Sequence, residues 1–463
     1  MTLIKSISGI RGTIGGTPGE ALTPVDIVKF AAAYSIWLTK RSEKKQLKVI
    51  VGRDARISGK MVDNLISGTL MSCGIDVINI GLATTPTVEM AVTIEHADGG
   101  IILTASHNPK QWNALKLLNE KGEFLSATDG AELLTIAERG DFNFVDVDNL
   151  GKLSYNNTYT DKHIEAILKL PTVDVDAIYR ANFKVVVDAV NSVGGIAIPQ
   201  LLRALGVQVV ELYCEPNGQF PHNPEPLPEH LTEISKLVVA EDADLGIVVD
   251  PDVDRLALVC ENGQMFGEEY TLVAIADYIL SKEKGNIVSN LSSSRALHDI
   301  TEQYGGQYYA AAVGEVNVVD KMKDVSAIIG GEGNGGVIYP ALHYGRDALV
   351  GAALFLSHLA HKNIKVSELR ASYPPYFISK NKIELTTDIN VEAILQAIKT
   401  KYVSQRINDI DGVRIDFDNE KKWVHLRKSN TEPIVRIYAE ANTPEIANEL
   451  AKQIIADIRN LTK

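Results

Sequence analysis

Short apolar runs alternate with amphipathic stretches along most of the chain. Lys48-Val-Ile-Val51 and Lys184-Val-Val-Val187 are typical of buried strands, and each is followed by a helical stretch and a second strand, at residues 74–80 and 206–212. This alternation of strands and helices predicts mixed α/β layers.

One segment of this pattern occurs more than once. Residues 97–104 (ADGGIILT) resemble residues 243–250 (ADLGIVVD), and a fainter third copy starts at residues 286–291 and ends at residues 326–332. Similarity at this long period indicates duplicated domains rather than a solenoid. The copies place three unusual loops at equivalent positions, so these loops can face each other if the domains pack around one cleft.

The last part of the chain has a different pattern. From about Tyr376 it predicts a strand, a helix over 390–402, three strands and a final helix after Thr443-Pro444. Thr followed by Pro is typical of a helix start, and Thr23-Pro24 begins an early helix in the same way. We therefore predict an α/β protein of three similar mixed α/β domains and a C-terminal α+β domain. The predicted domains are residues 1–152, 153–256, 257–372 and 373–463.

Composition narrows the classes of protein. The 463 residues carry a net charge of −13, which disfavours a nucleic-acid partner, because phosphate backbones require clustered Lys and Arg. The sequence shows neither a signal-peptide core nor an apolar stretch long enough to span a bilayer. Cys73, Cys214 and Cys260 are far apart and odd in number, which argues against a disulfide framework or a Cys-based metal site. We predict a cytoplasmic protein with no membrane partner.

A serine follows the strand at residues 100–103, in the segment Thr104-Ala-Ser-His-Asn-Pro109. Open α/β sheets bind ligands at this end of their strands. A Ser-His-Asp hydrolase is disfavoured, because adjacent residues rarely form the nucleophile–base bond and the Gly-x-Ser-x-Gly elbow is missing. Ser106 fits better as a carrier of a phosphoryl group, and an ordinary Ser-Asn turn is the alternative.

An acidic cluster follows the equivalent strand of the second copy, in Asp250-Pro-Asp-Val-Asp-Arg255. Carboxylates at alternate positions can converge, and they repel one another unless a cation lies between them. Oxygen ligands suit Mg²⁺. A calcium EF-hand fails because Arg255 stands where glycine is required and residues 256–259 indicate a strand. A solvated acidic turn is the remaining alternative, although such turns do not usually follow a buried strand.

Two further loops carry candidate binding groups. Glu332 and Asn334 lie in the glycine-rich run at residues 330–336 and can bond sugar hydroxyls, although such a run can also be a flexible turn. Arg427-Lys-Ser-Asn-Thr-Glu-Pro433 lies between two strands, and its groups suit a phosphate or form a polar hairpin. Gly-bounded loops also carry Arg11 and Arg56. Lys116 is either a site residue or a surface lysine.

Together these motifs resemble the α-D-phosphohexomutase superfamily, over essentially the whole chain and in the family's order. The resemblance implies a four-domain enzyme around a deep central cleft, with Ser106 as the phosphoserine. It implies that Asp250, Asp252 and Asp254 hold Mg²⁺ together with that phosphoserine.

The resemblance also implies roles for the other candidates. Arg11 and Lys116 match residues that transfer protons or stabilise charge, and His107 matches a motif position beside the serine. For the general base we expect Lys116 with a lowered pKa, or else His107. The implied substrate-binding residues are Arg255 for the sugar phosphate, Glu332 and Asn334 for the sugar, and Arg427, Ser429, Asn430 and Thr431 for the phosphate.

The implied reaction moves a phosphoryl group from Ser106 to a hexose phosphate through a hexose 1,6-bisphosphate. Glu315 follows Gly314 where several relatives carry Gly-His or Gly-Asp, and a carboxylate there favours the ammonium group of an amino sugar. Glu315 and the Thr431-Glu-Pro433 ending of the predicted phosphate loop together favour a phosphoglucosamine mutase. The alternative is a phosphomannomutase/phosphoglucomutase. A silent binding protein would be expected to lack the serine or an aspartate, and a phosphatase would release phosphate without isomerised sugar. We expect a monomer or homodimer.

Overall fold

The structure is a computed structural model that describes residues 2–6, 9–384, 391–428 and 434–461. It divides into two compact units, one of residues 1–271 and 334–367 and one of residues 272–333 and 368–463. Across the described ranges, no helix is long and apolar enough to cross a membrane.

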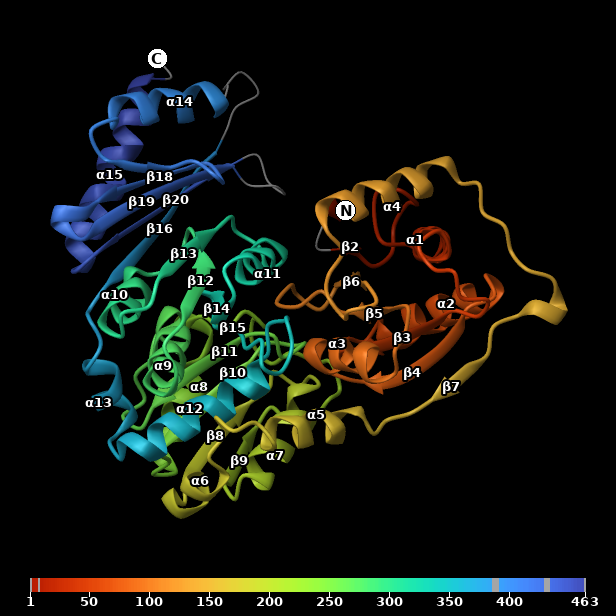
Figure 1. The fold of residues 1–463 in the computed structure, drawn as a ribbon, viewed down its shortest axis with the longest axis horizontal. Helices are drawn as coiled ribbons and strands as arrows, with labels where there is room; N and C mark the ends of the chain where they lie inside the picture. The colour runs from red at the N-terminus through yellow and green to blue at the C-terminus, as the bar shows by residue number, and fades with distance from the viewer. Residues whose placement is uncertain (1, 7–8, 385–390, 429–433, 462–463) are drawn as a thin grey trace. The chain divides into compact units, whose positions relative to one another are not determined.

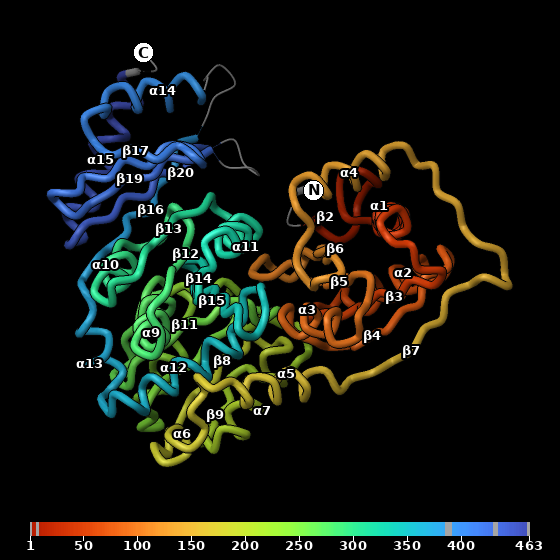
Figure 2. Tube along the Cα trace, viewed as in Figure 1, coloured from red at the N-terminus to blue at the C-terminus, as the bar shows by residue number. Residues whose placement is uncertain are grey.

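The first unit begins with a seven-stranded mixed sheet of order β1-β2-β6-β5-β3-β4-β7 (Figure 1). Its strands are β1 (Leu3–Ser6), β2 (Gly9–Thr13), β3 (Lys48–Arg53), β4 (Asp76–Leu82), β5 (Gly99–Leu103), β6 (Trp112–Leu118) and β7 (Leu153–Tyr155). Its helices are α1 (Pro24–Thr39), α2 (Gly59–Ser72), α3 (Thr85–Ile94) and α4 (Ala127–Arg139). Figure 2 shows β7 at the end of the long connection after α4, where it pairs in parallel with β4.

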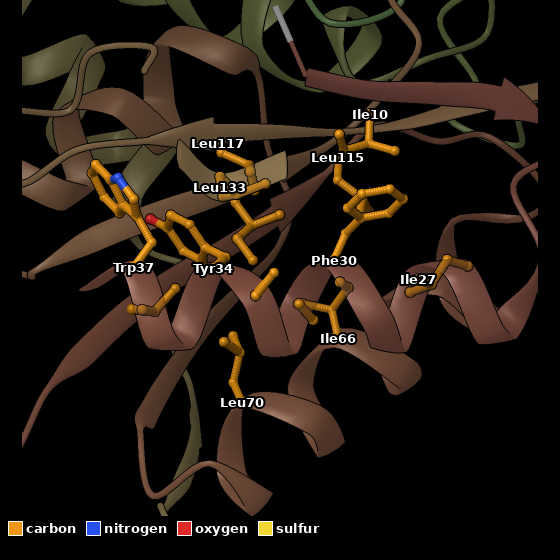
Figure 3. Close-up of a cluster of buried hydrophobic side chains, with 14 of the residues drawn as sticks. Ile10, Ile27, Phe30, Tyr34, Trp37, Ile66, Leu70, Leu115, Leu117 and Leu133 are labelled. Atoms are coloured by element: carbon orange, nitrogen blue, oxygen red, sulfur yellow. The ribbon is translucent and has the colours of Figure 1, made fainter. Parts of the chain in front are cut away.

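Helices cover both faces of this sheet, as the alternating side chains of its strands require. Val49 and Val51 belong to a core with residues of α1, α2 and α4, whereas Ile50 belongs to a core with Val88 and Val92 of α3. Figure 3 shows the larger core, which includes Phe30, Tyr34, Trp37, Ile66, Leu70 and Leu133. The strand predicted from Lys48 to Val51 is therefore confirmed as a strand buried on both faces.

The predicted helix starts are confirmed at both Thr-Pro pairs. The Thr23 side chain caps α1 by accepting from the Asp26 N–H, and the Asp26 carboxylate accepts from the Thr23 N–H at 3.2 Å. At the other pair, Thr443 Oγ1 accepts from the Ile446 N–H at 3.3 Å at the start of α15 (Pro444–Leu461).

The first unit continues with a four-stranded sheet of order β11-β10-β8-β9. Its strands are β8 (Lys184–Asp188), β9 (Gln208–Leu212), β10 (Leu245–Val249) and β11 (Leu256–Cys260). Its other elements are α5 (Tyr159–Leu168), α6 (Val175–Ala181), α7 (Gly194–Ala204), α8 (Thr232–Ala240), β15 (Gly336–Ile338) and α12 (Ala348–Lys362). The predicted internal repeat has a structural counterpart: β5 leads into antiparallel β6 as β10 leads into antiparallel β11, and the serine and acidic loops lie at these two turns.

The second unit contains a parallel arrangement in which β12 pairs with β13 and β14. Its elements are α9 (Glu268–Lys282), β12 (Asn286–Asn290), α10 (Arg295–Gln303), β13 (Tyr308–Ala311), α11 (Glu315–Asp324), β14 (Ala327–Glu332) and α13 (Val366–Ala371). A five-stranded antiparallel sheet of order β16-β20-β19-β18-β17 follows. It is formed by β16 (Phe377–Glu384), β17 (Arg406–Asn408), β18 (Val413–Phe417), β19 (Lys422–Lys428) and β20 (Ile434–Ala441), with α14 (Val391–Lys401) and α15.

The prediction of three strands between the last two helices is wrong by one strand. The short β17 pairs with β18 at the sheet edge, and its three residues carry too little alternation to indicate a strand.

Candidate active site

Ser106 lies just beyond the carboxyl end of β5, in a strained backbone conformation. Its φ of 49° is in the left-handed region that side chains other than glycine seldom adopt. The Ser106 N–H donates to Thr104 Oγ1 at 3.0 Å, and the side chain is almost fully buried. Such strain persists only where surrounding contacts fix it.

Arg56 supplies most of these contacts. Its buried guanidinium donates to a set of backbone carbonyls in the serine loop, namely those of Ser106, Asn108, Pro109 and Trp112. Arg56 Nε also bonds Asp54 Oδ2 at 2.9 Å, and that oxygen accepts from Thr104 Oγ1 at 2.7 Å. The planar guanidinium of Arg56 therefore fixes the backbone along the serine loop. The sequence marked Arg56 only as an arginine in a Gly-bounded loop.

The three aspartates converge as the sequence predicts. One ligand oxygen from each of Asp250, Asp252 and Asp254 lies within 4.8 Å of the others, and all three residues are buried. Asp250 Oδ2 accepts from Ser106 Oγ at 2.7 Å, which joins the two loops. Burial and the two neighbouring aspartates raise the pKa of Asp250 well above its ordinary value.

Two positively charged side chains and one hydroxyl group donate hydrogen bonds to the carboxylates of Asp252 and Asp254. Lys116 Nζ lies 2.7 Å from Asp252 Oδ2 and 3.4 Å from Asp254 Oδ2. Arg346 donates to Asp254 Oδ2 at 2.7 Å, and Thr85 Oγ1 donates to Asp252 Oδ2 at 2.6 Å. Sequence reasoning missed Arg346 and Thr85, because each lies far from the aspartates along the chain.

The expectation that Lys116 has a lowered pKa is wrong in this structure. Burial alone would lower the pKa of Lys116, but Asp252 and Asp254 raise it above the ordinary lysine value. Lys116 is therefore a charged donor here and not a neutral base.

The acidic loop suits a divalent cation with oxygen ligands. Among the described residues, Asp252 Oδ1 and Asp254 Oδ1 are buried and have no hydrogen-bond partner. Buried carboxylate oxygens without partners are costly, and a hard cation would satisfy them. With the adjacent Ser106 Oγ, these oxygens form a donor set made only of oxygen.

Two of the remaining candidates in the first unit, His107 and Arg11, contact the serine loop. His107 Nδ1 lies 3.3 Å from Ser106 Oγ, and burial with the nearby Arg255 and Arg11 charges lowers the His107 pKa well below its ordinary value. Arg11 donates to Asn108 Oδ1 at 2.9 Å. Asn334 lies apart from these contacts, and its Oδ1 accepts from the Gly336 N–H at 3.2 Å.

Arg255 also lies at this loop. Its backbone N–H donates to Asp250 Oδ1 at 3.2 Å, and its guanidinium reaches the half-exposed Glu225 at 3.4 Å. The Arg255 side chain is therefore tied only weakly and can exchange Glu225 for an anionic group.

The second unit carries the other predicted binding residues. Glu332 is buried at the end of β14 and accepts from Asn290 Nδ2 at 2.9 Å and from the Gly314 N–H at 3.1 Å. Glu315 begins α11, directly after that glycine. Arg427, within β19, lies 2.9 Å from Asp411 Oδ2. The other three predicted phosphate ligands, Ser429, Asn430 and Thr431, lie outside the described residues.

The repeated α/β domains, the buried serine and the carboxylate cluster define an enzyme of phosphoryl transfer. Four family models match the chain in order: phosphoglucomutase/phosphomannomutase α/β/α domains I, II and III over residues 3–144, 161–263 and 267–376, and the C-terminal domain over residues 382–457. The chain belongs to the phosphoglucomutase/phosphomannomutase family and is thus a phosphohexomutase. The predicted four-domain architecture is confirmed, whereas the joins near residues 152, 256 and 372 stay predictions.

Relatives and solved structures agree with this family. A phosphoglucomutase/phosphomannomutase of Thermococcus kodakarensis is 37% identical over 443 residues, which cover 95% of this chain and 96% of the relative. A probable phosphoglucosamine mutase of Methanopyrus kandleri is 32% identical over 98% of this chain and 97% of its own. The crystal structure of a family protein from Burkholderia thailandensis has a TM-score of 0.83 at 26% identity and covers 99% of this chain and 96% of its own.

Proposed function

We propose that the chain interconverts glucosamine 6-phosphate and glucosamine 1-phosphate through phosphoserine 106 and a hexose 1,6-bisphosphate. The observation that carries the chemistry is the 2.7 Å bond from Ser106 Oγ to Asp250, which places the hydroxyl at the acidic cluster. Probable phosphoglucosamine mutases of Methanopyrus kandleri and Pyrococcus horikoshii support the choice of sugar. Phosphomannomutase/phosphoglucomutase activity is the alternative, supported by the Thermococcus relative.

The chain's own residues provide the parts of this reaction. We propose Asp250, Asp252 and Asp254 as ligands of Mg²⁺, which would neutralise charge on the transferring phosphoryl group. Arg56 holds Ser106 in place, and Lys116 supplies a fixed positive charge beside the carboxylates. His107, whose pKa is lowered, is the remaining candidate for accepting the proton of the substrate hydroxyl.

Substrate binding is proposed for the other loops. Arg255 and Arg11 offer positive charge near the serine, and the Arg427 loop, with Ser429, Asn430 and Thr431, would bind the distal phosphate. Glu332 and Asn334 would bond the sugar hydroxyls. Glu315 would meet the ammonium group, so Glu315→Gln should lower turnover of glucosamine phosphate selectively.

Initial rates test this proposal. Glucosamine 6-phosphate, mannose 1-phosphate and glucose 1-phosphate are compared with Mg²⁺ and the matching bisphosphate. We expect the highest kcat/KM for glucosamine phosphate; equal or higher values for the other sugars would reassign the substrate. Free phosphate without isomerised sugar would identify a phosphatase.

The serine has its own test. Ser106→Ala should abolish turnover, whereas Ser281→Ala, at an exposed serine on α9, should retain it. A Ser106→Ala enzyme with full activity would refute the phosphoserine.

A further inference from the structure

A second cluster of metal-ligating groups lies in the first unit and takes no part in the proposed reaction. His163 comes from α5, His343 from the loop before α12, and Asp347 is the N-cap residue of α12. The Nε2 atoms of His163 and His343 lie 2.9 Å and 3.3 Å from the same oxygen, Asp347 Oδ2. We call these three residues the histidine cluster.

The spacing of these atoms suits a tetrahedral ion. The three ligand atoms lie within 4.8 Å of one another. Zinc bonds to nitrogen and oxygen are about 2.0–2.1 Å long, which places neighbouring tetrahedral ligands about 3.3 Å apart. The two measured nitrogen–oxygen separations are close to that value, so a small adjustment of the rings would admit the ion.

The outer ring nitrogens are held as they are in metal-binding histidines. His163 Nδ1 lies 3.0 Å from Thr87 Oγ1, and His343 Nδ1 lies 3.3 Å from Glu89 Oε2. Both partners come from α3. Histidines that bind metals commonly direct the second ring nitrogen to a carboxylate or another acceptor, which fixes the ring and the tautomer.

The carboxyl groups around the two histidines also favour a bound cation. Asp347 and Glu89 are both buried, and each places a carboxyl oxygen 3.3 Å from a ring nitrogen of His343. Burial lowers the pKa of His343, but its bonds to Asp347 and Glu89 raise it to about 10. One divalent ion with two neutral imidazoles balances both carboxylates.

We propose that His163, His343 and Asp347 bind a divalent transition-metal ion such as Zn²⁺, separately from the acidic loop. The nitrogen ligands favour a borderline ion of this kind, whereas the all-oxygen acidic loop favours a hard one. The partly exposed His343 offers an approach for the ion, and a water molecule would complete its coordination.

A bound ion would hold in place the segments that carry Arg346 and Thr85, the two residues that bond the acidic loop. Arg346, which bonds Asp254, is the residue before Asp347, and Thr85, which bonds Asp252, lies on α3 with Thr87. A metal ion at the histidine cluster would therefore join α3, α5 and the start of α12, two of which contact the catalytic carboxylates.

Zinc binding to the full chain tests the site. After treatment with a chelator, Zn²⁺ is titrated against a chromophoric competitor. We expect one tight zinc per chain in the unaltered protein and in Asp250→Asn, and at least tenfold weaker binding in His163→Gln and in His343→Gln. His96→Asn, at an exposed histidine, is the matched control and should bind as the unaltered protein does. Absence of tight zinc, or unchanged binding in both cluster variants, would overturn the proposal.

A second measurement needs no variant and so does not depend on how the variants fold. Co²⁺ added to the unaltered protein should give the strong visible absorption of a tetrahedral site, and excess Mg²⁺ should leave that absorption in place. If Mg²⁺ removes all of it, Co²⁺ occupies the acidic loop alone and the histidine cluster binds no metal. Neither result changes the proposed mutase reaction, which rate measurements test.

Discussion

The acidic loop contains three buried carboxylates and the histidine cluster contains one, and the oxygens of the two sites differ in their hydrogen-bond partners. In the acidic loop, Lys116 and Arg346 bond the Oδ2 atoms, and among the described residues Asp252 Oδ1 and Asp254 Oδ1 have no hydrogen-bond partner. In the histidine cluster both oxygens of Asp347 have partners, because Oδ1 accepts backbone N–H groups of α12 and Oδ2 faces the two imidazoles. The acidic loop thus keeps two buried oxygens available to a cation, whereas the oxygens of Asp347 already join α5 and α12.

Removing one carboxylate from the acidic loop should give the largest effect and tests whether this site serves activity rather than stability. Asp250→Asn should lower kcat by about a thousandfold or more, because it removes a proposed ligand for Mg²⁺ and the partner of Ser106. It should not destabilise the chelator-treated protein, since three carboxylates that repel one another become two. Steady-state rates and a urea titration measure the two effects. A strong loss of stability with intact turnover would reverse the assignment.

The corresponding change in the histidine cluster should act mainly on stability. Asp347→Asn should cost about 3–5 kcal/mol in the free energy of unfolding, because it removes the buried negative charge that faces two histidines. Asp176→Asn, at an exposed position of α6, is the control and should cost less than about 0.5 kcal/mol. Equal urea midpoints for the two variants would show that the cluster is not structural.

Within the described part of the chain, the hydrogen-bond partners of the buried His425 are a hydroxyl and a backbone carbonyl rather than carboxylates, which extends the comparison. His425 of β19 lies 2.9 Å from Ser292 Oγ, and burial lowers its pKa to about 4, opposite in direction to His343. Because the unfolded chain binds this proton more tightly, the stability from neutral His425 is complete above about pH 6.5 and is lost as the pH falls toward 4.

This loss should amount to about 3 kcal/mol in the free energy of unfolding, from a pKa difference of roughly 2.5 units at 1.36 kcal/mol each. Urea titrations in steps from pH 7 to 4 measure it. His425→Asn should flatten the profile over this interval, and a variant with an unchanged slope would assign the pH dependence to other groups.

The smallest of these effects is expected from a change in Arg56, which bonds the serine loop. Arg56→Lys should lower kcat about ten- to a hundredfold with little change in KM, because an ammonium group cannot bond four carbonyls and Asp54 at once. Arg53→Lys, at the end of β3 three residues before Arg56, is the matched control and should stay within about twofold. If the two variants behave alike, the contacts of Arg56 do not fix Ser106.

Features read from neighbouring residues were predictable from the sequence. The strand before Ser106, the convergence of the aspartates and the two Thr-Pro helix starts depend on local alternation and on backbone preference. The positions of Thr85 and Arg346 depend on how distant segments pack, which no local pattern encodes. The charge of Lys116 was misjudged for the same reason, since it is set by Asp252, which lies 136 residues further along the chain.

Gly335 limits how this enzyme can be re-engineered for another sugar. Its carbonyl accepts from the Leu256 N–H at 3.0 Å, its φ is 83°, and a Cβ there would lie 2.2 Å from the Leu256 carbonyl oxygen. The loop of Asn334 is thereby fastened to the strand that leaves the acidic loop. A graft that changes the Asn334 loop must therefore keep glycine at this position, or the strand that leaves the acidic loop will shift with it.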